Sequence, residues 1–347
     1  MEIFKDKCTV LVTGANGFIG SAICNALMSE NVELIALTEP NTDISNLKGI
    51  QAKVIEADIR DFNSLDRAFK KVDYIFHCAA IYRFNSKDKE LFYDVNVKGS
   101  INVVKAALSN NVKKIVYTST VGTVGLKNSR VSTEDCFADI SHLYGNYKRS
   151  KYVAEHEVLR LAARGAPVVL VQPTMPVGPR DIAPSPSGKM VVDFLNKKMI
   201  GYADTVMNIV DVDDVAHGHL LAMDKGKVGF SYIVGGENLT MKEILDILEA
   251  VTNFKYSRAR VPNFIILSMG YISEFVEANL LSKTPSVPLE AAKMATSYMA
   301  FDDSFARKTL GYSSRPANTA LLRSCSWYLN NGYVKPQFMN QIKFNST

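Results

Sequence analysis

The feature that most constrains the fold is Val10-Leu-Val-Thr-Gly14-Ala-Asn-Gly17-Phe-Ile-Gly20, in which three glycines spaced three apart follow an apolar run. The run from Cys8 to Thr13 is apolar and β-branched without alternation, which is typical of a strand buried on both faces of a parallel sheet. Gly14 permits a tight turn, Gly17 lets a phosphate approach the backbone, and Gly20 lets the next helix pack closely. The helix that begins at Gly17 would point its free N–H groups at the phosphates. The segment therefore predicts a dinucleotide site.

Apolar runs alternate with helical patterns through the first half of the chain. Helices are predicted at residues 17–30, 64–71, 91–108 and 144–164. Strands are predicted at residues 8–13, 32–38, 52–57, 74–78, 114–119 and 168–171. Repeated β-α-β units with short connections favour right-handed crossovers and a doubly wound, Rossmann-type parallel sheet of six strands.

The pattern changes after Pro173. Five prolines crowd into residues 173–188, which predicts a loop across the mouth of the sheet. We expect a Rossmann NAD(P)-binding core at residues 1–175 and a smaller mixed α/β substrate-binding lobe at residues 176–347, with some segments returning to the core. The pieces expected in this second part are residues 190–196, 207–212, 213–223, 230–234, 241–251, 264–281, 289–299 and 316–331.

The run from Phe264 to Leu281 is the most apolar of these pieces. It carries Ser268, Ser273, Glu274, Glu277 and Asn279, which a membrane-spanning helix rarely tolerates. We predict a buried amphipathic helix. A surface that touches lipid or a lipidic substrate, and a transmembrane span, are the alternatives.

Composition excludes several classes of protein. The 347 residues carry a net charge of +5 without a basic block, so a nucleic-acid partner is not indicated. Five scattered cysteines without a C-x-x-C pair are typical of reduced, buried thiols in a cytosolic protein. The first residues have charges and no apolar core, so we expect no signal peptide and a cytoplasmic location. No metal site is expected, because no metal-binding pattern surrounds His77, His142, His156, His217 and His219.

Tyr147 and Lys151 are candidates for proton chemistry. They stand four residues apart in a predicted helix, so they share a face, and an ammonium beside a phenol lowers the phenol's pKa. Tyr147 is therefore a candidate proton donor and acceptor near neutral pH. Tyr144 and Lys148 have the same spacing, so spacing alone leaves two registers open.

The chain resembles the extended short-chain dehydrogenases/reductases from Lys7 to about Tyr333. The matching motifs are Thr13-Gly-x-x-Gly-x-x-Gly20, His77-Cys-Ala-Ala80, Asp94-x-Asn96-x-x-Gly99 and Tyr147-Lys-Arg-Ser-Lys151. Within that superfamily it is most similar to dihydroflavonol-reductase-like proteins and hopanoid-associated sugar epimerases, on segments such as Pro176-Val-Gly-Pro and Gly235-Gly-Glu-Asn-Leu-Thr240. The family's Tyr-x-x-Ser-Lys pattern selects Tyr147 with Lys151 and makes Tyr144 a packing or substrate residue.

The resemblance implies a role for each catalytic residue. Tyr147 is the general acid/base, and Lys151 lowers its pKa and bonds the nicotinamide ribose. Thr120 holds the substrate oxygen, with Ser119 as the alternative, although a hydroxyl at a strand end is often only a cap or turn residue. Asn96 would anchor a water or a backbone bend beside the lysine, unless it is merely a polar residue at a helix start.

The resemblance also implies the cofactor contacts. Glu39 follows the second strand and would accept from the adenosine ribose and repel a 2′-phosphate, so NAD is expected, with NADP possible. The alternative is that Glu39 is a solvated turn residue. Asp58 would bond the adenine amino group, and Ile59 would pack on the ring. The remaining cofactor contacts expected are Gly14, Asn16, Gly17, Phe18, Ile19, Gly20, Ala79, Ala80, Asn96, Tyr147, Lys151 and Pro173.

Four residues are candidates for substrate binding besides Thr120. Tyr82 and Arg83 should face the pocket, where Arg83 would meet an anionic or polyhydroxylated group unless it points to solvent. Met175 and Met207 stand where relatives that act on nucleotide-diphosphate sugars carry Asn and Arg. Two thioethers in these places favour a more apolar ligand, although a methionine is often only a core residue.

We expect an enzyme for a small-molecule substrate. The first reading is reversible hydride transfer between NAD(H) and a ketone, aldehyde or secondary alcohol on a bulky molecule. The second is a sugar epimerase or dehydratase, acting on a nucleotide-diphosphate sugar or a glycolipid, that regenerates its bound NAD. The third is a nucleotide-sensing binding protein without turnover. The resemblance implies a homodimer formed through the helices at residues 94–108 and 144–164.

Overall fold

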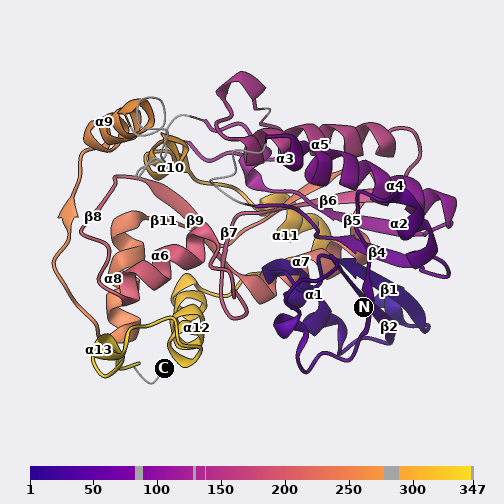
Figure 1. The fold of residues 1–347 in the computed structure, drawn as a ribbon, viewed down its shortest axis with the longest axis horizontal. Helices are drawn as coiled ribbons and strands as arrows, with labels where there is room; N and C mark the ends of the chain where they lie inside the picture. The colour runs from indigo at the N-terminus through magenta and orange to yellow at the C-terminus, as the bar shows by residue number, and fades with distance from the viewer. Residues whose placement is uncertain (83–88, 128–129, 137, 277–288, 345–347) are drawn as a thin grey trace.

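The computed structural model describes residues 1–82, 89–127, 130–136, 138–276 and 289–344. Within them, seven parallel strands form the main sheet, with helices on both faces, so the predicted doubly wound α/β fold is confirmed (Figure 1). The strands run in the order β10-β6-β5-β4-β1-β2-β3. Their bounds are β1 Cys8–Thr13, β2 Val32–Thr38, β3 Lys53–Glu56, β4 Tyr74–His77, β5 Lys114–Thr118, β6 Val168–Pro173 and β10 Ser231–Val234.

The predicted count of six strands is wrong, because β10 pairs in parallel with β6 and adds a seventh. Tyr232, Ile233 and Val234 are fully buried, and a short apolar run carries no signal of which sheet it joins. The winding direction changes between β1 and β4. Their carboxyl ends therefore open the crevice in which open α/β sheets bind ligands.

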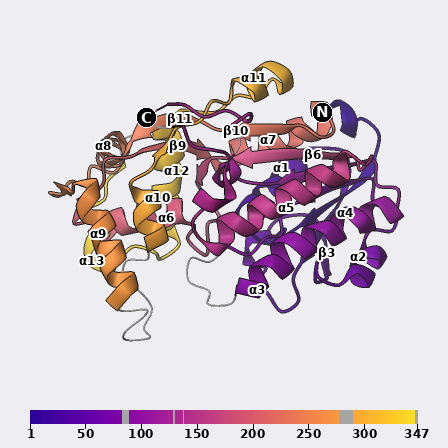
Figure 2. The same cartoon turned by 90° about the horizontal axis from the view of Figure 1, so that it is seen from above.

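Helices cover the two faces of the sheet in two sets (Figure 2). Alternate residues of each strand point to opposite faces, so Val10 and Val12 pack into one apolar cluster and Leu11 packs into the other. One face carries α1 Phe18–Leu27, α7 Val212–Lys225 and α11 Ser304–Leu310. The other carries α2 Phe62–Ala68, α4 Ser100–Ser109 and α5 Asn146–Ala162.

The helix predicted at residues 91–108 is not regular. It consists of α3 Lys89–Phe92, a π-helical segment η3 Tyr93–Gly99 and then α4. Periodicity of apolar residues predicts a helix but does not reveal a wider local turn, and such turns occur frequently at functional sites.

The second part of the chain forms a smaller lobe beside the carboxyl ends of the strands (Figure 1). Its sheet contains β7 Met175–Val177, β9 Val206–Asp211, β11 Glu237–Thr240 and β13 Tyr298–Met299. Helices α6 Pro186–Leu195, α8 Met241–Thr252 and α12 Ala317–Asn330 bury a third apolar cluster with it. The remaining elements are η1 Glu2–Phe4, η2 Ser45–Leu47, η4 Val121–Thr123, η5 Ile140–His142, β8 Gly201–Tyr202, β12 Ala259–Arg260, α9 Asn263–Ser273, α10 Leu289–Ala295 and α13 Pro336–Met339.

The loop predicted over residues 173–188 is wrong at both ends. Strand β7 lies inside it and pairs with β9. Helix α6 begins at Pro186, where Ser185 caps the helix by accepting from the Gly188 N–H, and proline fits the first turn because no intrahelical bond is lost there. Proline content alone did not separate a loop from a helix start.

The prediction of a buried helix at residues 264–281 is also wrong for its described part, which ends at residue 276. Phe264 is 70% and Ile272 is 62% exposed, and Met269, Tyr271 and Phe275 are exposed as well. A Cβ on Gly270 of α9 would lie 2.8 Å from the Ala292 side chain of α10, so one face is packed closely. Burial in the core therefore does not account for the exposed apolar side chains of this run. In the described ranges, no helix has the length and apolar character that a bilayer crossing requires.

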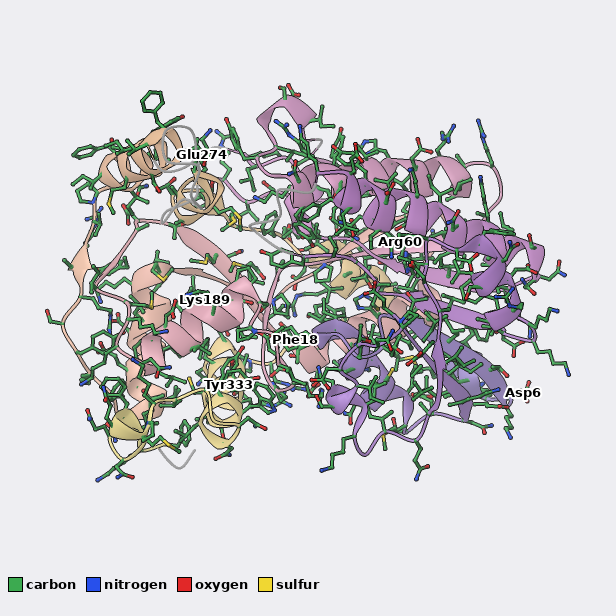
Figure 3. The ribbon with its side chains drawn as sticks, in the orientation of Figure 1. Asp6, Phe18, Arg60, Lys189, Glu274 and Tyr333 are labelled. Atoms are coloured by element: carbon green, nitrogen blue, oxygen red, sulfur yellow. The ribbon has the colours of Figure 1, made fainter. Side chains whose placement is uncertain are left out.

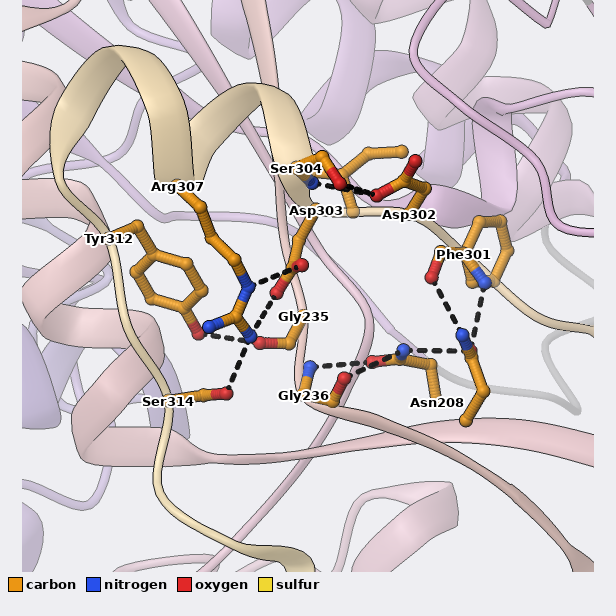
Figure 4. Close-up of polar contacts among 12 residues, drawn as sticks. Asn208, Gly235, Gly236, Phe301, Asp302, Asp303, Ser304, Arg307, Tyr312 and Ser314 are labelled. Carbon is orange, nitrogen blue, oxygen red and sulfur yellow. Dashed lines mark hydrogen bonds and ion pairs between the residues drawn. The ribbon is translucent and has the colours of Figure 1, made fainter.

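Hydrogen bonds fasten the turn after β10 to the lobe (Figure 4). The Gly236 N–H donates to Asn208 Oδ1 over 2.8 Å, and the Tyr312 hydroxyl donates to the Gly235 carbonyl over 2.7 Å. Asn208 Nδ2 also donates to Asn238 Oδ1, and Asn238 Nδ2 donates to the Phe301 carbonyl. Segments from beyond residue 175 thus pack on both sheets. The division into domains at residue 175 stays a prediction.

All five cysteines lie in the described residues and are free thiols. Cys8, Cys24 and Cys325 are buried, whereas Cys78 and Cys136 are partly exposed, so the expectation of buried thiols holds for three of them.

Candidate active site

The glycine turn forms a cradle that no larger residue could replace. Gly14 has a φ of 63°, and a Cβ there would lie 2.7 Å from the Ala79 Cα atom. A Cβ on Gly20 would lie 2.1 Å from the Gly14 carbonyl oxygen. Helix α1 starts at Phe18 after Gly17, without a side-chain cap on its first N–H groups. An uncapped helix start beside bare backbone fits the diphosphate of a dinucleotide, which such N–H groups bind.

Two side chains at the start of this helix are only partly buried. Phe18 and Ile19 pack against the first apolar cluster. Figure 3 places Phe18 where the main sheet and the lobe meet. The side-chain amide of Asn16 donates to Thr42 Oγ1 and to the Asp43 carbonyl, and its contact with the cofactor stays a prediction.

Charged side chains follow β2 and β3 at the same edge of the sheet. Glu39 is exposed, and its carboxylate lies 4.0 Å from the guanidinium of Arg60. Arg60 is labelled in Figure 3. Arg60 also pairs with Asp58 over 2.6 Å, and this bond holds the pKa of the Asp58 carboxyl below its ordinary value. Ile59 is buried against Gly99 rather than presented as an open surface. Sequence reasoning missed Arg60, which stands two residues after Asp58.

Asn96 fixes the backbone beside the candidate catalytic helix. It is buried in η3, where its Oδ1 accepts from the Ile81 N–H over 2.8 Å and its Nδ2 donates to Ser150 Oγ over 2.9 Å. Asn96 therefore ties the chain after β4 to α5, which is the backbone role considered for it. It does not open a helix, because α3 precedes it. Ala79 and Ala80 follow β4, and Pro173 is buried at the end of β6.

Tyr147 and Thr120 meet at the carboxyl edge of the sheet. Burial raises the pKa of the Tyr147 phenol, and a hydrogen bond with the Thr120 side chain offsets part of that rise. The Tyr82 ring stands edge-on to the Tyr147 ring, with centroids 4.4 Å apart. Ser119, the alternative to Thr120, instead donates its hydroxyl to Glu155 and is buried. Arg83 lies outside the described residues.

The Lys151 ammonium is bound by groups of β5. Its ammonium donates to the Tyr117 hydroxyl over 2.9 Å and to the Thr118 carbonyl over 2.8 Å. Lys151 is only 3% exposed, and burial lowers its pKa to about 8, opposed by the nearby Glu155 and Cys78. Burial raises the pKa of the Tyr147 phenol, while the ammonium of Lys151 is bound by Tyr117 and Thr118, so the acidification of Tyr147 by Lys151 stays a prediction.

Tyr144 and Lys148, the other pair with a spacing of four, have different surroundings. Tyr144 is exposed just before α5, and the Lys293 ammonium lies 3.3 Å from the centre of its ring. The Lys148 side chain passes near Gly122, where a Cβ would lie 3.6 Å from it.

The two methionines belong to the lobe. Met207 is buried in the third apolar cluster, and Met175 packs against that cluster while remaining partly exposed at the start of β7. Met207 is therefore a core residue, which was the alternative considered for it.

Sequence reasoning missed a buried polar group behind the site. Glu155 accepts from Ser119, from Thr123 over 2.9 Å and from Gln172 over 3.1 Å. Its position four residues after Lys151 was the available signal, since helical spacing puts both on one face.

Comparisons with known proteins show the family of the chain. The family model described as the NAD dependent epimerase/dehydratase family matches residues 10–235. A putative dihydroflavonol 4-reductase from Synechocystis sp. is 35% identical, over 94% of this chain and 96% of that protein. Sterol demethylase protein B from Methylococcus capsulatus is 30% identical, over 94% of this chain and 100% of that protein. The crystal structure of gox2253 is 37% identical with a TM-score of 0.86, over 94% of this chain and 99% of that one. The chain therefore belongs to the NAD dependent epimerase/dehydratase family, the extended short-chain dehydrogenases/reductases, and is an NAD-dependent enzyme.

Proposed function

We propose that the protein transfers hydride reversibly between NAD(H) and a ketone, aldehyde or secondary alcohol on a bulky, largely apolar molecule. The observation that carries this proposal is the position of the Thr120 side chain beside the Tyr147 phenol, whose pKa it lowers against the effect of burial. A phenol and a hydroxyl in that position can both reach one substrate oxygen. Bound NAD(H) accepts or supplies the hydride.

The chain's own residues manage the proton and the position of the oxygen. The Tyr147 phenol is protonated at neutral pH because its pKa is raised, so it gives its proton to a carbonyl oxygen during reduction and recovers it during oxidation. Thr120 orients that oxygen by hydrogen bonding. Lys151 contributes its positive charge one helical turn along, which stabilises the phenolate left by proton transfer. Ser119 is removed from this role by its bond to Glu155.

The adenosine end supports NAD over NADP. Glu39 is exposed at the end of β2, free to accept from ribose hydroxyls, and its carboxylate would repel a 2′-phosphate. Arg60 pairs with Asp58 over 2.6 Å and lies 4.0 Å from Glu39, so its charge faces two carboxylates. We assign the glycine turn to the diphosphate, and Asp58 to the adenine.

The substrate side is aromatic and apolar where it is described. Tyr82 lines the approach to Tyr147, and Met175 remains partly exposed beside the lobe's cluster. Two relatives are named for dihydroflavonol reduction and for sterol demethylation, and both names fit a bulky ring system as substrate.

The second candidate is an epimerase or dehydratase that regenerates its NAD in every cycle, since the matching family model is named for those reactions. Both candidates use Tyr147 and Thr120. The third candidate, a nucleotide sensor without turnover, leaves the contact between these two side chains without a purpose.

A screen separates these candidates. The purified protein is mixed with NAD and a panel of ring-bearing secondary alcohols, or with NADH and the matching ketones, while cofactor absorbance is followed. The proposal predicts net change in absorbance with at least one pair. Conversion of a nucleotide-diphosphate sugar without net change would favour the epimerase or dehydratase instead. Absence of any conversion, with tight nucleotide binding, would favour the sensor.

A further inference from the structure

A buried carboxylate lies behind the candidate catalytic residues and belongs to none of the roles above. Glu155 is 6% exposed and stands one turn after Lys151 on α5, which carries Tyr147 one turn before it. In this helix the three side chains recur at intervals of four and therefore share one face. The described hydrogen-bond partners of Glu155 are the neutral side chains of Ser119, Thr123 and Gln172. A buried carboxylate is costly unless its hydrogen bonds are satisfied, so its partners define what it does.

Those partners flank Thr120 on both sides. The Ser119 hydroxyl donates to Glu155, and Thr123 Oγ1 lies 2.9 Å from the same carboxylate oxygen. Thr123 Oγ1 also lies 2.7 Å from the Thr120 carbonyl, so its single hydrogen is shared between these two acceptors. The Gln172 amide of β6 donates to both Glu155 oxygens, over 3.1 and 3.2 Å. One side chain thus links α5, the end of β5, η4 and β6.

Glu155 also interacts electrostatically with the Lys151 ammonium. Four other titratable side chains near that ammonium are neutral around pH 8. Burial lowers the pKa of His77 to about 3 and raises the pKa of Cys78 to about 12. Burial also raises the pKa values of the Tyr117 and Tyr147 phenols. Glu155 raises the pKa of Lys151 against the effect of burial, and the spacing of four residues on α5 puts the two side chains on one face of the helix.

We propose that Glu155 is a positioning residue: its carboxylate holds the turn from Ser119 to Thr123, and with it Thr120, against Tyr147, and it balances the buried charge of Lys151. The proposal deepens the proposed function and rests on it for the roles of Thr120 and Tyr147. Its two parts are separable, because Glu155→Gln removes the charge while keeping the size, and Thr123→Val removes the link to Thr120 while keeping the charge.

The charge is tested by NMR titration of the full chain labelled with ¹³C-lysine, with the Lys151 signal assigned by its loss in Lys151→Arg. In the wild type this signal should titrate near the pKa of about 8. In Glu155→Gln its midpoint should fall by about one pH unit, because an opposing negative charge is gone. Glu157→Gln is the matched control. Glu157 lies on the same helix but is bonded to exposed Arg160, so its loss should leave the midpoint unchanged.

The link to Thr120 is tested by hydrogen exchange in Thr123→Val. The Gly122 N–H donates to Thr120 Oγ1 over 3.0 Å, and the Thr123 N–H donates to the Thr120 carbonyl over 3.2 Å. Exchange at these amides should accelerate by about fivefold, as expected for one lost hydrogen bond, with the Lys151 midpoint unchanged.

Neither measurement needs turnover, so failure of the proposed activity would leave both readable. A Lys151 midpoint in Glu155→Gln equal to that of the wild type would overturn the charge role. Wild-type exchange in Thr123→Val would overturn the positioning role, and that variant remains informative if Glu155→Gln does not fold.

Discussion

Burial acts on Tyr147 and Lys151 in opposite directions, because it disfavours the charged form of each. It raises the pKa of the Tyr147 phenol and lowers that of the Lys151 ammonium to about 8. At neutral pH the phenol therefore keeps its proton while the ammonium keeps its charge. The sequence predicted that these two residues act together from their spacing. Spacing could not predict burial, or that Tyr117 and the Thr118 carbonyl would bind the ammonium.

A pH dependence follows for the two directions of the proposed reaction. Reduction needs a protonated Tyr147 and a charged Lys151, so kcat/KM for a ketone should be level from pH 6 to about 8 and fall above it. Alcohol oxidation needs a proton acceptor, so its kcat/KM should rise with pH over that range. Initial rates across pH values with one alcohol–ketone pair check both slopes. A reduction rate that increases steadily from pH 6 to 9 would contradict this assignment.

Among single elements, the turn from β1 into α1 was the most predictable and the helix before β5 the least. The turn leaves no room for side chains at its glycines. This requirement is local, so the glycine spacing in the sequence can reveal it. The π-helical turn in η3 and the exposed face of α9 depend on which neighbours pack against them. Apolar periodicity reports that a face is apolar. It does not report what covers that face.

Substitutions of Gly20 and Gly17 in the glycine turn should affect stability and cofactor binding differently. Gly20→Ala places a Cβ 2.1 Å from the Gly14 carbonyl oxygen, so the backbone must shift, and Tm should fall by several degrees, corresponding to about 1–3 kcal/mol for an overpacked site. In Gly17→Ala the nearest atom is 3.2 Å away, so the loss of stability should be smaller. The added methyl would instead block the approach of phosphate, and NADH affinity should fall by about tenfold or more.

Thermal unfolding followed by circular dichroism, together with NADH titration, measures both effects. If the Tm of Gly20→Ala equals that of the wild type, the turn can relax without a loss of stability. The account of the cradle would then be wrong.

For the whole molecule, local patterns gave the order of strands and helices in the core and the expectation that some later segments return to it, whereas which segment joins the main sheet was not visible. Strand β10 completes the main sheet from 231–234, after the lobe has begun. What places it there is its backbone pairing with β6, such as the bond from the Leu170 N–H to the Phe230 carbonyl over 2.9 Å. Such contacts join residues far apart in sequence, so composition and periodicity carry no trace of them. The expected homodimer stays a prediction that the mass in solution would test.

Tyr147→Phe removes one hydroxyl and tests the proposed proton exchange most directly. The substitution keeps the ring that packs against Tyr82 and removes the atom proposed to exchange the proton. Tyr152→Phe is its control, because it deletes a hydroxyl on the same helix that donates to the Ala138 carbonyl. Both variants should bind NADH as the wild type does. Turnover of the substrate found by the screen should fall by about 100-fold or more in Tyr147→Phe alone, the usual contribution of general acid–base catalysis. A Tyr147→Phe enzyme that binds NADH normally and turns over at the wild-type rate would contradict the account.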